Sequence, residues 1–368
     1  MQAVILVGGE GTRLRPLTST VPKPVVPLVD RPFLAYMLEW LKSHGVDDVV
    51  LLMGYLPTAV REVLGDGSQF GLKITYVEEP DPRGTAGALK FAEDLLAERF
   101  FMLNGDVLTD LDLTAQLRQH EETGAQGTLA LVPVDDPSAY GLVRCDGTWA
   151  VNGFVEKPPA DQVPADPLIS AGAYILERSV VDMIPADQNV SIEREVWPKL
   201  VGNGLYGFAD RRAYWMDIGT PERYLQGTFD IIEKQVKTQV ADRLGVGYLA
   251  IHESVQGDGR VVPPAVVEEG CVIGEGAHVG SLVVLGPDVK VGARAKIERS
   301  VVLAGAEIGA DCVLQDCVVA PGARVGEGVH VTGGSILGDG VVVGAGNVIA
   351  HGMRVFPNVE IPEGAVKF

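Results

Sequence analysis

The sequence has 368 residues, of which 46% are hydrophobic, and a formal net charge of −19 at pH 7. This length exceeds that of one typical domain and favours two, while the hydrophobic fraction is sufficient for a well-packed core. The negative charge argues against nucleic acid and anionic membrane surfaces as partners, so any phosphate site has to be a local basic pocket in an acidic surface.

The cysteines and the apolar segments favour a cytoplasmic protein. None of Cys145, Cys271, Cys312 and Cys317 has the C-x-x-C spacing of a metal site, and we expect all four to be buried, reduced thiols. The N-terminus lacks a charged segment before a long apolar run, and no stretch reaches the roughly 18 apolar residues that a membrane-spanning helix needs. We therefore expect no membrane-spanning segment.

Strands and helices are predicted to alternate over about the first 230 residues. Apolar runs predict strands at 4–7, 48–53, 73–77 and 100–103. Helices are predicted from Arg31-Pro32 to Gly45, at 58–64 and at 85–96. This alternation predicts a Rossmann-like α/β fold, with a mostly parallel sheet and helices on both faces. Ligands of such sheets bind beyond the carboxyl ends of the strands.

The strands become denser between residues 128 and 175, where Cys145-Asp146-Gly147 predicts a hairpin turn. A helical stretch is expected at 191–200, and a last long helix is expected from Pro221 to about Lys237.

From about Ala265, an aliphatic residue recurs at every sixth position, which is typical of a hexapeptide β-helix. The repeat keeps step through Ile273, Val279, Leu285, Val291, Ile297 and Leu303, shifts by one residue to Ile308 and Leu314, and shifts again to Val325, Val331, Leu337, Val343 and Ile349. Roughly a dozen hexads, at three per triangular coil, predict about four coils.

A glycine-rich loop, Gly8-Gly9-Glu10-Gly11-Thr12-Arg13, follows the first predicted strand. Glycines let the backbone turn tightly and bring consecutive N–H groups against an anion. Arg13 and Lys23, the latter between two prolines, add two cations, and the combination suits a polyphosphate. The dinucleotide fingerprint would need glycine at Leu14 and the P-loop would need glycine at Arg13, so neither motif is present.

The string GGEGTRLRPLT, followed by PKP, resembles the nucleotide loop of the sugar-nucleotide pyrophosphorylases. The resemblance covers nearly the whole chain through GTAGAL, LNGDV, YGLV, FVEKP, SAGAY, SIEREVWP, WMDIGTPERYL and the hexads, and it is strongest to the GDP-mannose pyrophosphorylases. It implies a catalytic nucleotidyltransferase domain at 1–237, a linker at 238–264 and a left-handed β-helix at 265–368. The implied reaction is attack of mannose 1-phosphate on the α-phosphorus of GTP, with Mg2+ as cofactor.

The same resemblance implies roles for individual residues. Arg13, Lys23 and Lys157 would be catalytic, the first two on the triphosphate and the third on the sugar phosphate. The nucleotide would be bound by Leu6, Gly8, Gly9, Gly11, Thr12, Arg13, Lys23, Glu79, Gly84, Thr85, Asn104 and Asp106. The sugar phosphate would be bound by Gly141, Glu156, Lys157, Ser170 and Gly172, with Ser170 standing where the eukaryotic-type enzymes carry asparagine.

Asp106 and Asp217 are the candidate magnesium ligands, because magnesium prefers one or two carboxylates together with phosphate oxygens and water. The alternative for an aspartate in a loop is a helix cap or an Asx turn, and for Asp217 the helix start at Thr220-Pro221 favours it. The resemblance implies that the metal lies between these two motifs.

Glu79 is the candidate residue for base selection. An ionised carboxylate accepts two hydrogen bonds and donates none, which matches the adjacent N–H donors of guanine at N1 and N2. Thymidylyl- and uridylyltransferases of similar build often carry glutamine at this position, so Glu79 favours guanine. The neighbouring Glu78 is the alternative.

Three other functions stay open on the sequence alone. The chain could make dTDP-, UDP- or ADP-glucose, since mannose and glucose 1-phosphates differ in one hydroxyl. The β-helix could carry an acyltransferase site using His278, His330 or His351, or the chain could be a non-catalytic regulatory subunit. We expect the β-helix to serve assembly into a homo-oligomer.

Overall fold

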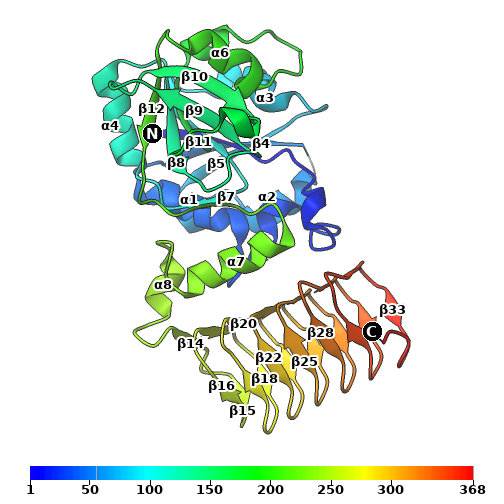
Figure 1. Ribbon diagram of the computed structural model, residues 1–368. Helices are drawn as coiled ribbons and strands as arrows, with labels where there is room; N and C mark the ends of the chain where they lie inside the picture. Colours follow the sequence, from blue (N-terminus) through cyan, green and yellow to red (C-terminus); the bar gives the residue numbers. More distant parts are fainter. Residues whose placement is uncertain (55, 368) are drawn as a thin grey trace. The chain divides into compact units, whose positions relative to one another are not determined.

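A computed structural model describes residues 1–54 and 56–367, and the chain forms two compact units (Figure 1). Unit 1 comprises Met1–Gly9 and Leu34–Trp215, and unit 2 comprises Glu10–Phe33 and Met216–Phe368. The chain thus leaves unit 1 within the glycine-rich loop. This division differs from the predicted domains because residues 10–33 belong to the same unit as the C-terminal part of the chain.

The centre of unit 1 is a nine-stranded sheet with the order β10-β9-β11-β6-β1-β4-β5, in which β8 pairs with β11 and β12 pairs with β8. Its parallel half consists of β6 (Arg99–Asn104), β1 (Gln2–Leu6), β4 (Asp48–Met53) and β5 (Lys73–Glu78). These strands lie where the apolar runs predicted them. They confirm the Rossmann-like α/β class.

The other half of the sheet is mainly antiparallel. It consists of β8 (Gly127–Pro133), β9 (Gly141–Cys145), β10 (Val151–Glu156), β11 (Leu168–Glu177) and β12 (Leu205–Ala209). The strand β11 runs antiparallel to β6, β8 and β9, and so joins the two halves. The predicted hairpin is confirmed, because β9 and β10 pair from Cys145 and Val151 onward.

Helices cover this sheet: α1 (Phe33–Ser43), α2 (Pro57–Leu64), α3 (Gly84–Phe91), α4 (Leu113–Thr123), α5 (Ser179–Asp182) and α6 (Trp197–Leu200), with a π-turn at Ile192–Val196. Two predicted boundaries are wrong. The first helix starts later because Arg31–Pro32 forms strand β3, which pairs with β2 (Pro27–Leu28). Helix α3 ends at Phe91 because the Ala92 N–H is shared between two carbonyls and the chain tightens into a 3-10 turn at Glu93–Leu95.

In unit 2, α7 (Pro221–Ile232) is followed by α8 (Gln239–Arg243). The prediction of one helix to Lys237 is wrong, because Lys234 adopts a left-handed conformation (φ 60°) and the Gln235 N–H returns to the Asp230 carbonyl at 2.8 Å. This is the hydrogen-bond pattern that closes a helix end. The remaining short strand β13 spans Trp215–Asp217, and β7 spans Val107–Thr109.

Unit 2 contains three sheets of short strands, of seven, seven and six strands in the described chain, and every neighbouring pair is parallel. One sheet contains β14 (Leu249–Ile251), β17 (Ala265–Val267), β20 (Val283–Leu285), β23 (Ser300–Val302), β26 (Val318–Val319), β29 (Ile336–Leu337) and β32 (Arg354–Val355). The second contains β15 (Gln256–Gly257), β18 (Val272–Ile273), β21 (Lys290–Val291), β24 (Glu307–Ile308), β27 (Arg324–Val325), β30 (Val342–Val343) and β33 (Glu360–Ile361). The third contains β16 (Arg260–Val261), β19 (His278–Val279), β22 (Lys296–Glu298), β25 (Val313–Gln315), β28 (His330–Thr332) and β31 (Val348–Ile349).

This arrangement is consistent with the predicted left-handed β-helix, but it has more than the predicted four coils. The first coil, β14 to β16, lies within the segment 238–264 that we expected to be a linker. The repeat is concealed there because Gly257 occupies the position that aligns with Ile273 in the next coil.

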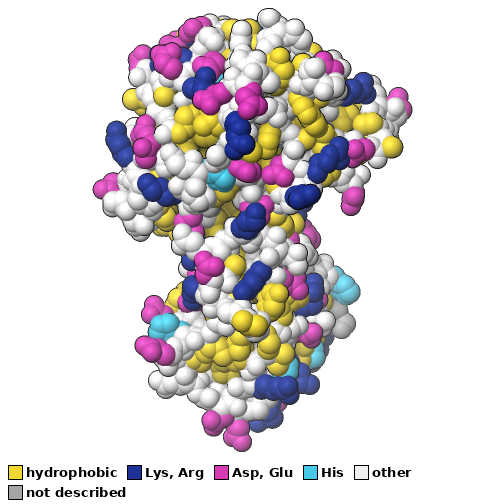
Figure 2. Space-filling view, turned by 90° about the vertical axis from the view of Figure 1, so that its left-hand side faces the viewer, with side chains coloured by type: hydrophobic (Ala, Val, Ile, Leu, Met, Phe, Trp, Pro, Cys, Tyr) yellow, Lys and Arg dark blue, Asp and Glu magenta, His cyan; other side chains and the backbone are white. Residues whose placement is uncertain are grey.

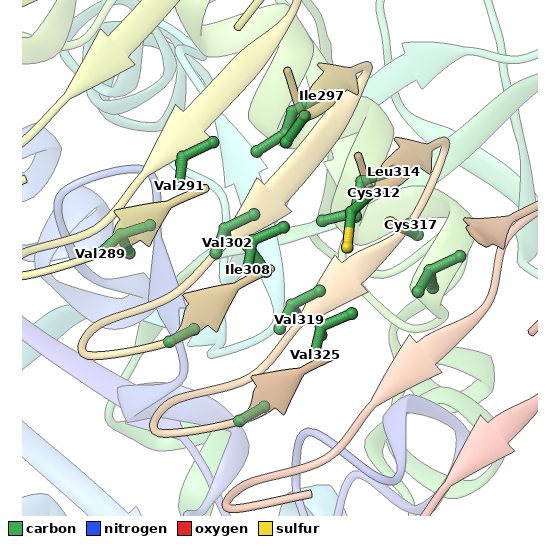
Figure 3. Close-up of a cluster of buried hydrophobic side chains, with 14 of the residues drawn as sticks. Val289, Val291, Ile297, Val302, Ile308, Cys312, Leu314, Cys317, Val319 and Val325 are labelled. Atoms are coloured by element: carbon green, nitrogen blue, oxygen red, sulfur yellow. The ribbon is translucent and has the colours of Figure 1, made fainter. Parts of the chain in front are cut away.

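The interior of the β-helix is a column of buried aliphatic side chains together with the thiols of Cys271, Cys312 and Cys317 (Figure 3). Val302, and not the predicted Leu303, continues the column after Ile297, and it pairs in register with Leu285. The shortened step is accompanied by a left-handed turn at Arg299 (φ 46°). A similar turn at Asp316 (φ 49°) precedes Val319 of the column.

All four cysteines are free thiols. Cys271, Cys312 and Cys317 are buried, as expected. Cys145 lies at the hairpin and is partly exposed, so the prediction that it is buried is wrong. Among the described helices, none is both long and apolar enough to cross a membrane. Acidic and basic side chains are interspersed over the face shown in Figure 2, in keeping with the absence of a basic stretch in the sequence.

Candidate functional site

The carboxyl ends of the parallel strands bring together the first part of the predicted nucleotide site. Leu6, at the end of β1, is in register with Asn104, at the end of β6, and with Leu52 of β4. The Val7 N–H donates to the Leu52 carbonyl at 2.9 Å, so the pairing of β1 with β4 continues up to the residue before Gly8. This is the edge of the sheet at which α/β folds bind ligands.

Gly105 fixes the turn that carries Asp106. Its N–H donates to the Leu6 carbonyl at 2.9 Å, and a Cβ at this position would lie 2.4 Å from Val7 Cγ1. Only glycine therefore allows the end of β6 to lie against the end of β1. The partly buried Asp106 follows directly.

Glu79 lies at the same edge, one residue after β5. Its N–H donates to the Met53 carbonyl at 2.9 Å, and its Oε2 accepts from the Arg83 N–H at 3.1 Å. Its Oε1 faces Gly8, at 3.9 Å from where a Gly8 Cβ would stand. Burial raises the pKa of Glu79, and the Arg83 N–H partly offsets this rise.

Glu78 points to a different environment. Its carboxylate pairs with Arg61 at 2.7 Å, and its side chain is 52% exposed. Of the two candidates for reading the base, Glu79 is the one beside the glycine loop.

The start of α3 is enclosed by the segment before the π-turn. Gly84 has φ 68°, and a Cβ on it would lie 2.6 Å from the Val190 carbonyl oxygen. The Thr85 hydroxyl donates to Glu193 at 2.9 Å and accepts from the Ile192 N–H at 2.8 Å. The hydroxyl of Thr85 is thus engaged within the protein.

Glu193 is a group at the site that the sequence analysis missed. Its Oε2 accepts from Thr85 and also from Ser191, the latter at 2.6 Å. It lies within the string SIEREVWP, which contributed to the resemblance, but no local pattern connects it with the residues of FVEKP. Its charge acts on Glu156, whose pKa is raised first by burial and then by Glu193.

The β9–β10 hairpin brings together three of the predicted sugar-phosphate residues. Gly141 is directly opposite Glu156, and the Lys157 N–H donates to the Tyr140 carbonyl at 2.9 Å. A Cβ on Gly141 would lie 2.5 Å from the Phe154 ring and 3.2 Å from Glu156 Oε2. Lys157 adopts a left-handed conformation (φ 54°) and is exposed, so it leaves the strand at a sharp angle.

Ser170 and Gly172 lie at an irregularity in β11, where the register to β8 shifts between Ser170 and Tyr174. Gly172 has φ 73°, and a Cβ on it would lie 2.9 Å from Asn104 Nδ2. The Ser170 hydroxyl donates to the Tyr174 hydroxyl at 3.1 Å. This bulge therefore places predicted sugar residues beside Asn104, a predicted nucleotide residue.

Unit 2 carries the rest of the glycine-rich loop. Gly11 is left-handed (φ 63°), and its carbonyl accepts from the Thr18 hydroxyl at 2.8 Å. A short 3-10 turn follows at Thr12–Leu14, and a Cβ on Gly11 would lie 3.1 Å from Lys23 Cβ. The loop is thereby folded onto the segment that contains Lys23.

Arg13 is exposed, whereas Lys23 is only 8% exposed. Lys23 opens the 3-10 turn Lys23–Val25 and lines a small, mainly apolar pocket with Leu14, Val26, Leu28, Phe33, Ile218 and Tyr224. Its aliphatic stem is thus packed, as is common for long cationic side chains.

Asp217 and Arg13 meet at Gly219. A Cβ on this glycine would lie 3.0 Å from Arg13 Nη2 and 3.1 Å from Asp217 Oδ2, so Gly219 leaves room for both groups. Asp217 forms an ion pair with Arg223. The N-cap of α7 is Thr220, whose hydroxyl accepts from the Arg223 N–H at 3.4 Å, so Asp217 is not the cap of this helix.

Comparisons with known proteins define the class of this site. The nucleotidyl transferase family matches residues 2–234, and the GMPPB C-terminal domain matches residues 261–367. The chain belongs to the nucleotidyl transferase family, and the predicted resemblance is confirmed.

Individual relatives are more specific. The chain is 38% identical to a mannose-1-phosphate guanylyltransferase of Mycobacterium tuberculosis over 322 residues, which cover 86% of this chain and 83% of the relative. It is 36% identical to the mannose-1-phosphate guanylyltransferase catalytic subunit beta of Danio rerio, with 90% and 89% covered. Among solved structures, HddC from Yersinia pseudotuberculosis complexed with GMP-PN is 31% identical, with a TM-score of 0.54, and the match covers 62% of this chain and 99% of HddC.

Proposed function

We propose that this chain is a mannose-1-phosphate guanylyltransferase. The observation that carries the proposal is that relatives of this name, from bacteria and animals, match most of the chain and most of their own length. These names favour guanosine and mannose over the thymidine, uridine and glucose alternatives. They also favour an enzyme over a regulatory subunit.

In the proposed reaction, an oxygen of mannose 1-phosphate attacks the α-phosphorus of GTP, and the bond from this phosphorus to the β-phosphate oxygen breaks. GDP-mannose and pyrophosphate are the products. Such transfers depend on positioning and on neutralising charge more than on covalent catalysis. We assign Arg13 and Lys23 to the triphosphate and Lys157 to the sugar phosphate.

We assign the guanine edge to Glu79. Its Oε2 is already held by the Arg83 N–H, which leaves Oε1 and the remaining lone pairs for a ligand at the Gly8 loop. Gly8, Gly9, Gly11, Thr12, Gly84 and Thr85 are assigned to the nucleotide, with backbone N–H groups as the donors. Gly141, Glu156, Ser170 and Gly172 are assigned to the sugar.

Asp106 and Asp217 are the proposed magnesium ligands. Two carboxylates fit the donor set of this ion, which takes its other ligands from phosphate and water. Asp217 already has Arg223 as a cationic partner, so metal binding has to share or displace that pair. When bound, magnesium neutralises phosphate charge.

We further propose a cytoplasmic homo-oligomer assembled through the β-helix. Large apolar side chains of the β-helix, including Ile251, Val272, Phe356 and Val359, are each at least 40% exposed. Hydrophobic side chains also gather on the surface of the lower, C-terminal part of the chain in Figure 2. The four free thiols suit a reducing compartment.

The test is pyrophosphate release with magnesium, with GTP, UTP, dTTP and ATP each paired with mannose and glucose 1-phosphates. Strong preference for GTP with mannose 1-phosphate is expected. Preference for another pair would keep the chemistry and contradict the assigned substrates, whereas no release with any pair would contradict the enzyme.

A further inference from the structure

The backbone of the turn that carries Arg13 contains a carbonyl with no local donor. In the 3-10 turn Thr12–Leu14, the Gly11 carbonyl accepts from Leu14 and the Thr12 carbonyl accepts from Arg15. The next donor in this series would be the N–H of residue 16. That residue is proline, which has no N–H. The Arg13 carbonyl therefore receives no hydrogen bond from within its own turn, and its partner is either water or a group from elsewhere in the chain.

Arg354 in β32 of the β-helix supplies this partner. Its Nη1 donates to the Arg13 carbonyl at 3.2 Å and to the Arg15 carbonyl at 3.3 Å. A cation at the carboxyl end of a helical turn also interacts favourably with the exposed carbonyl dipoles. A guanidinium suits this position because it holds several donors in one fixed plane.

A second contact from the β-helix holds the far end of the same segment. The Thr20 hydroxyl donates to the carboxylate of Asp339. Asp339 follows β29, and β29 is the direct neighbour of β32, with Ile336 in register with Arg354. Two adjacent coils thus hold the segment near residues 13–15 and at residue 20.

Glu222 completes the surroundings of Arg354. It lies in the first turn of α7, and its pKa is lowered mainly by a hydrogen bond with Thr220 and further by the charge of Arg354. The guanidinium that binds the two carbonyls is therefore also close enough to the acidic start of α7 for its charge to act on Glu222.

We propose that Arg354 is a positioning residue for the nucleotidyl transfer, acting through Arg13. By holding the carbonyls of Arg13 and Arg15, it fixes the backbone from which the exposed Arg13 side chain is presented, and Asp339 supports the same segment through Thr20. The β-helix then serves the reaction as well as assembly. This inference rests on the proposed catalytic role of Arg13.

The test uses the full-length enzyme and pyrophosphate release with GTP, mannose 1-phosphate and magnesium. Arg354→Ala is expected to lower kcat about tenfold, equivalent to ~1.4 kcal/mol of barrier, with a change in KM for mannose 1-phosphate below about twofold. The matched control is Arg294→Ala, which removes another exposed β-helix arginine, paired with Asp311 at 2.6 Å. Its kcat is expected to be that of the wild type.

A double-mutant cycle separates positioning from a general structural effect. If Arg354 acts through Arg13, adding Arg354→Ala to Arg13→Ala leaves kcat nearly unchanged. Arg354→Lys, which keeps a cation within reach of the carbonyls, is expected to restore part of the lost activity. Equal losses in both backgrounds, or wild-type kcat in Arg354→Ala, would overturn the inference.

Thr20→Val gives an independent arm if Arg354→Ala does not fold. It removes only the hydroxyl that binds Asp339, and it is expected to lower kcat less than Arg354→Ala and only when Arg13 is present. An unchanged kcat in Thr20→Val would count against the inference. Failure of the wild type to release pyrophosphate would instead overturn the proposed function, and this inference with it.

Discussion

Exchanging Glu79 for glutamine tests how the chain selects its base. In the wild type, Oε2 accepts from the Arg83 N–H at 3.1 Å while Oε1 faces Gly8. In Glu79→Gln, only one of the two positions can be an oxygen. The Arg83 N–H requires an acceptor, so the amide oxygen is expected to stay there and the NH2 group to take the position facing the glycine loop.

The cost for GTP follows from this orientation. A guanine edge with two donors loses one charge-assisted hydrogen bond and meets an NH2 group in its place. A hydrogen bond to a charged group contributes about 1.5–3 kcal/mol, so kcat/KM for GTP should fall about 10- to 150-fold. Uracil and thymine present an acceptor beside their single donor, so kcat/KM for UTP and dTTP should rise relative to kcat/KM for GTP.

The assay is pyrophosphate release with each nucleotide at subsaturating concentration. The matched control is Glu78→Gln, because Glu78 is the adjacent glutamate but is paired with Arg61 and exposed. Its GTP preference should equal that of the wild type. Unchanged GTP selectivity in Glu79→Gln, or a loss of selectivity in Glu78→Gln, would refute the reasoning.

Glu79→Gln is expected to lower activity with GTP but to raise the stability of the fold. Burial raises the pKa of Glu79 above its unfolded value, so the folded state binds this proton more tightly and loses stability as pH rises from the unfolded pKa through the folded pKa. Above that window, Glu79→Gln removes a charge that is costly to bury. Its melting temperature at pH 7 should therefore exceed that of the wild type, and the gain should disappear as the pH falls well below the unfolded pKa, where both states are protonated.

Three further predictions concern other parts of the chain. Lys157→Ala should raise KM for mannose 1-phosphate far more than KM for GTP, and equal changes in steady-state assays would contradict its assignment to the sugar phosphate. Leu314→Ala should lower the free energy of unfolding by about 2–5 kcal/mol in urea, because the side chain is fully buried, whereas Val272→Ala on the exposed side of a coil should change it little. Light scattering at micromolar concentration should give the mass of a dimer or larger assembly, and a monomeric mass would refute the assembly role of the β-helix.

The sequence identified those features that depend on a short stretch of chain. The strands around the glycine loop were predictable because their apolar runs are bounded by glycines or prolines. The hexads were predictable because one aliphatic residue is needed at each interior position of a coil. Where two neighbouring residues are both aliphatic, as at Val302 and Leu303, the repeat cannot say which one is interior. Only pairing with Leu285 decides it.

Two features were missed, one because a residue adopts an unusual local conformation and one because it depends on a distant part of the chain. The end of α7 depends on a left-handed lysine, Lys234, a conformation that lysine seldom favours locally. Glu193 accepts a hydrogen bond from the Thr85 hydroxyl, a contact across 108 residues of chain. The strings that carry the family resemblance therefore did not reveal the hydrogen bonds that orient their side chains.

The segment Arg13-Leu14-Arg15-Pro16 combines a local feature with a contact to a distant part of the chain. Pro16 has no N–H, so the Arg13 carbonyl receives no hydrogen bond from within the 3-10 turn at Thr12–Leu14. The donor, Arg354, lies 341 residues further along the chain, in a hexad whose pattern gives no indication of this contact. The missing donor is thus a property of this short turn, whereas the group that binds the carbonyl is decided by the fold. If Arg354 is the partner that matters, the β-helix and the loop are under a shared constraint that neither motif displays by itself.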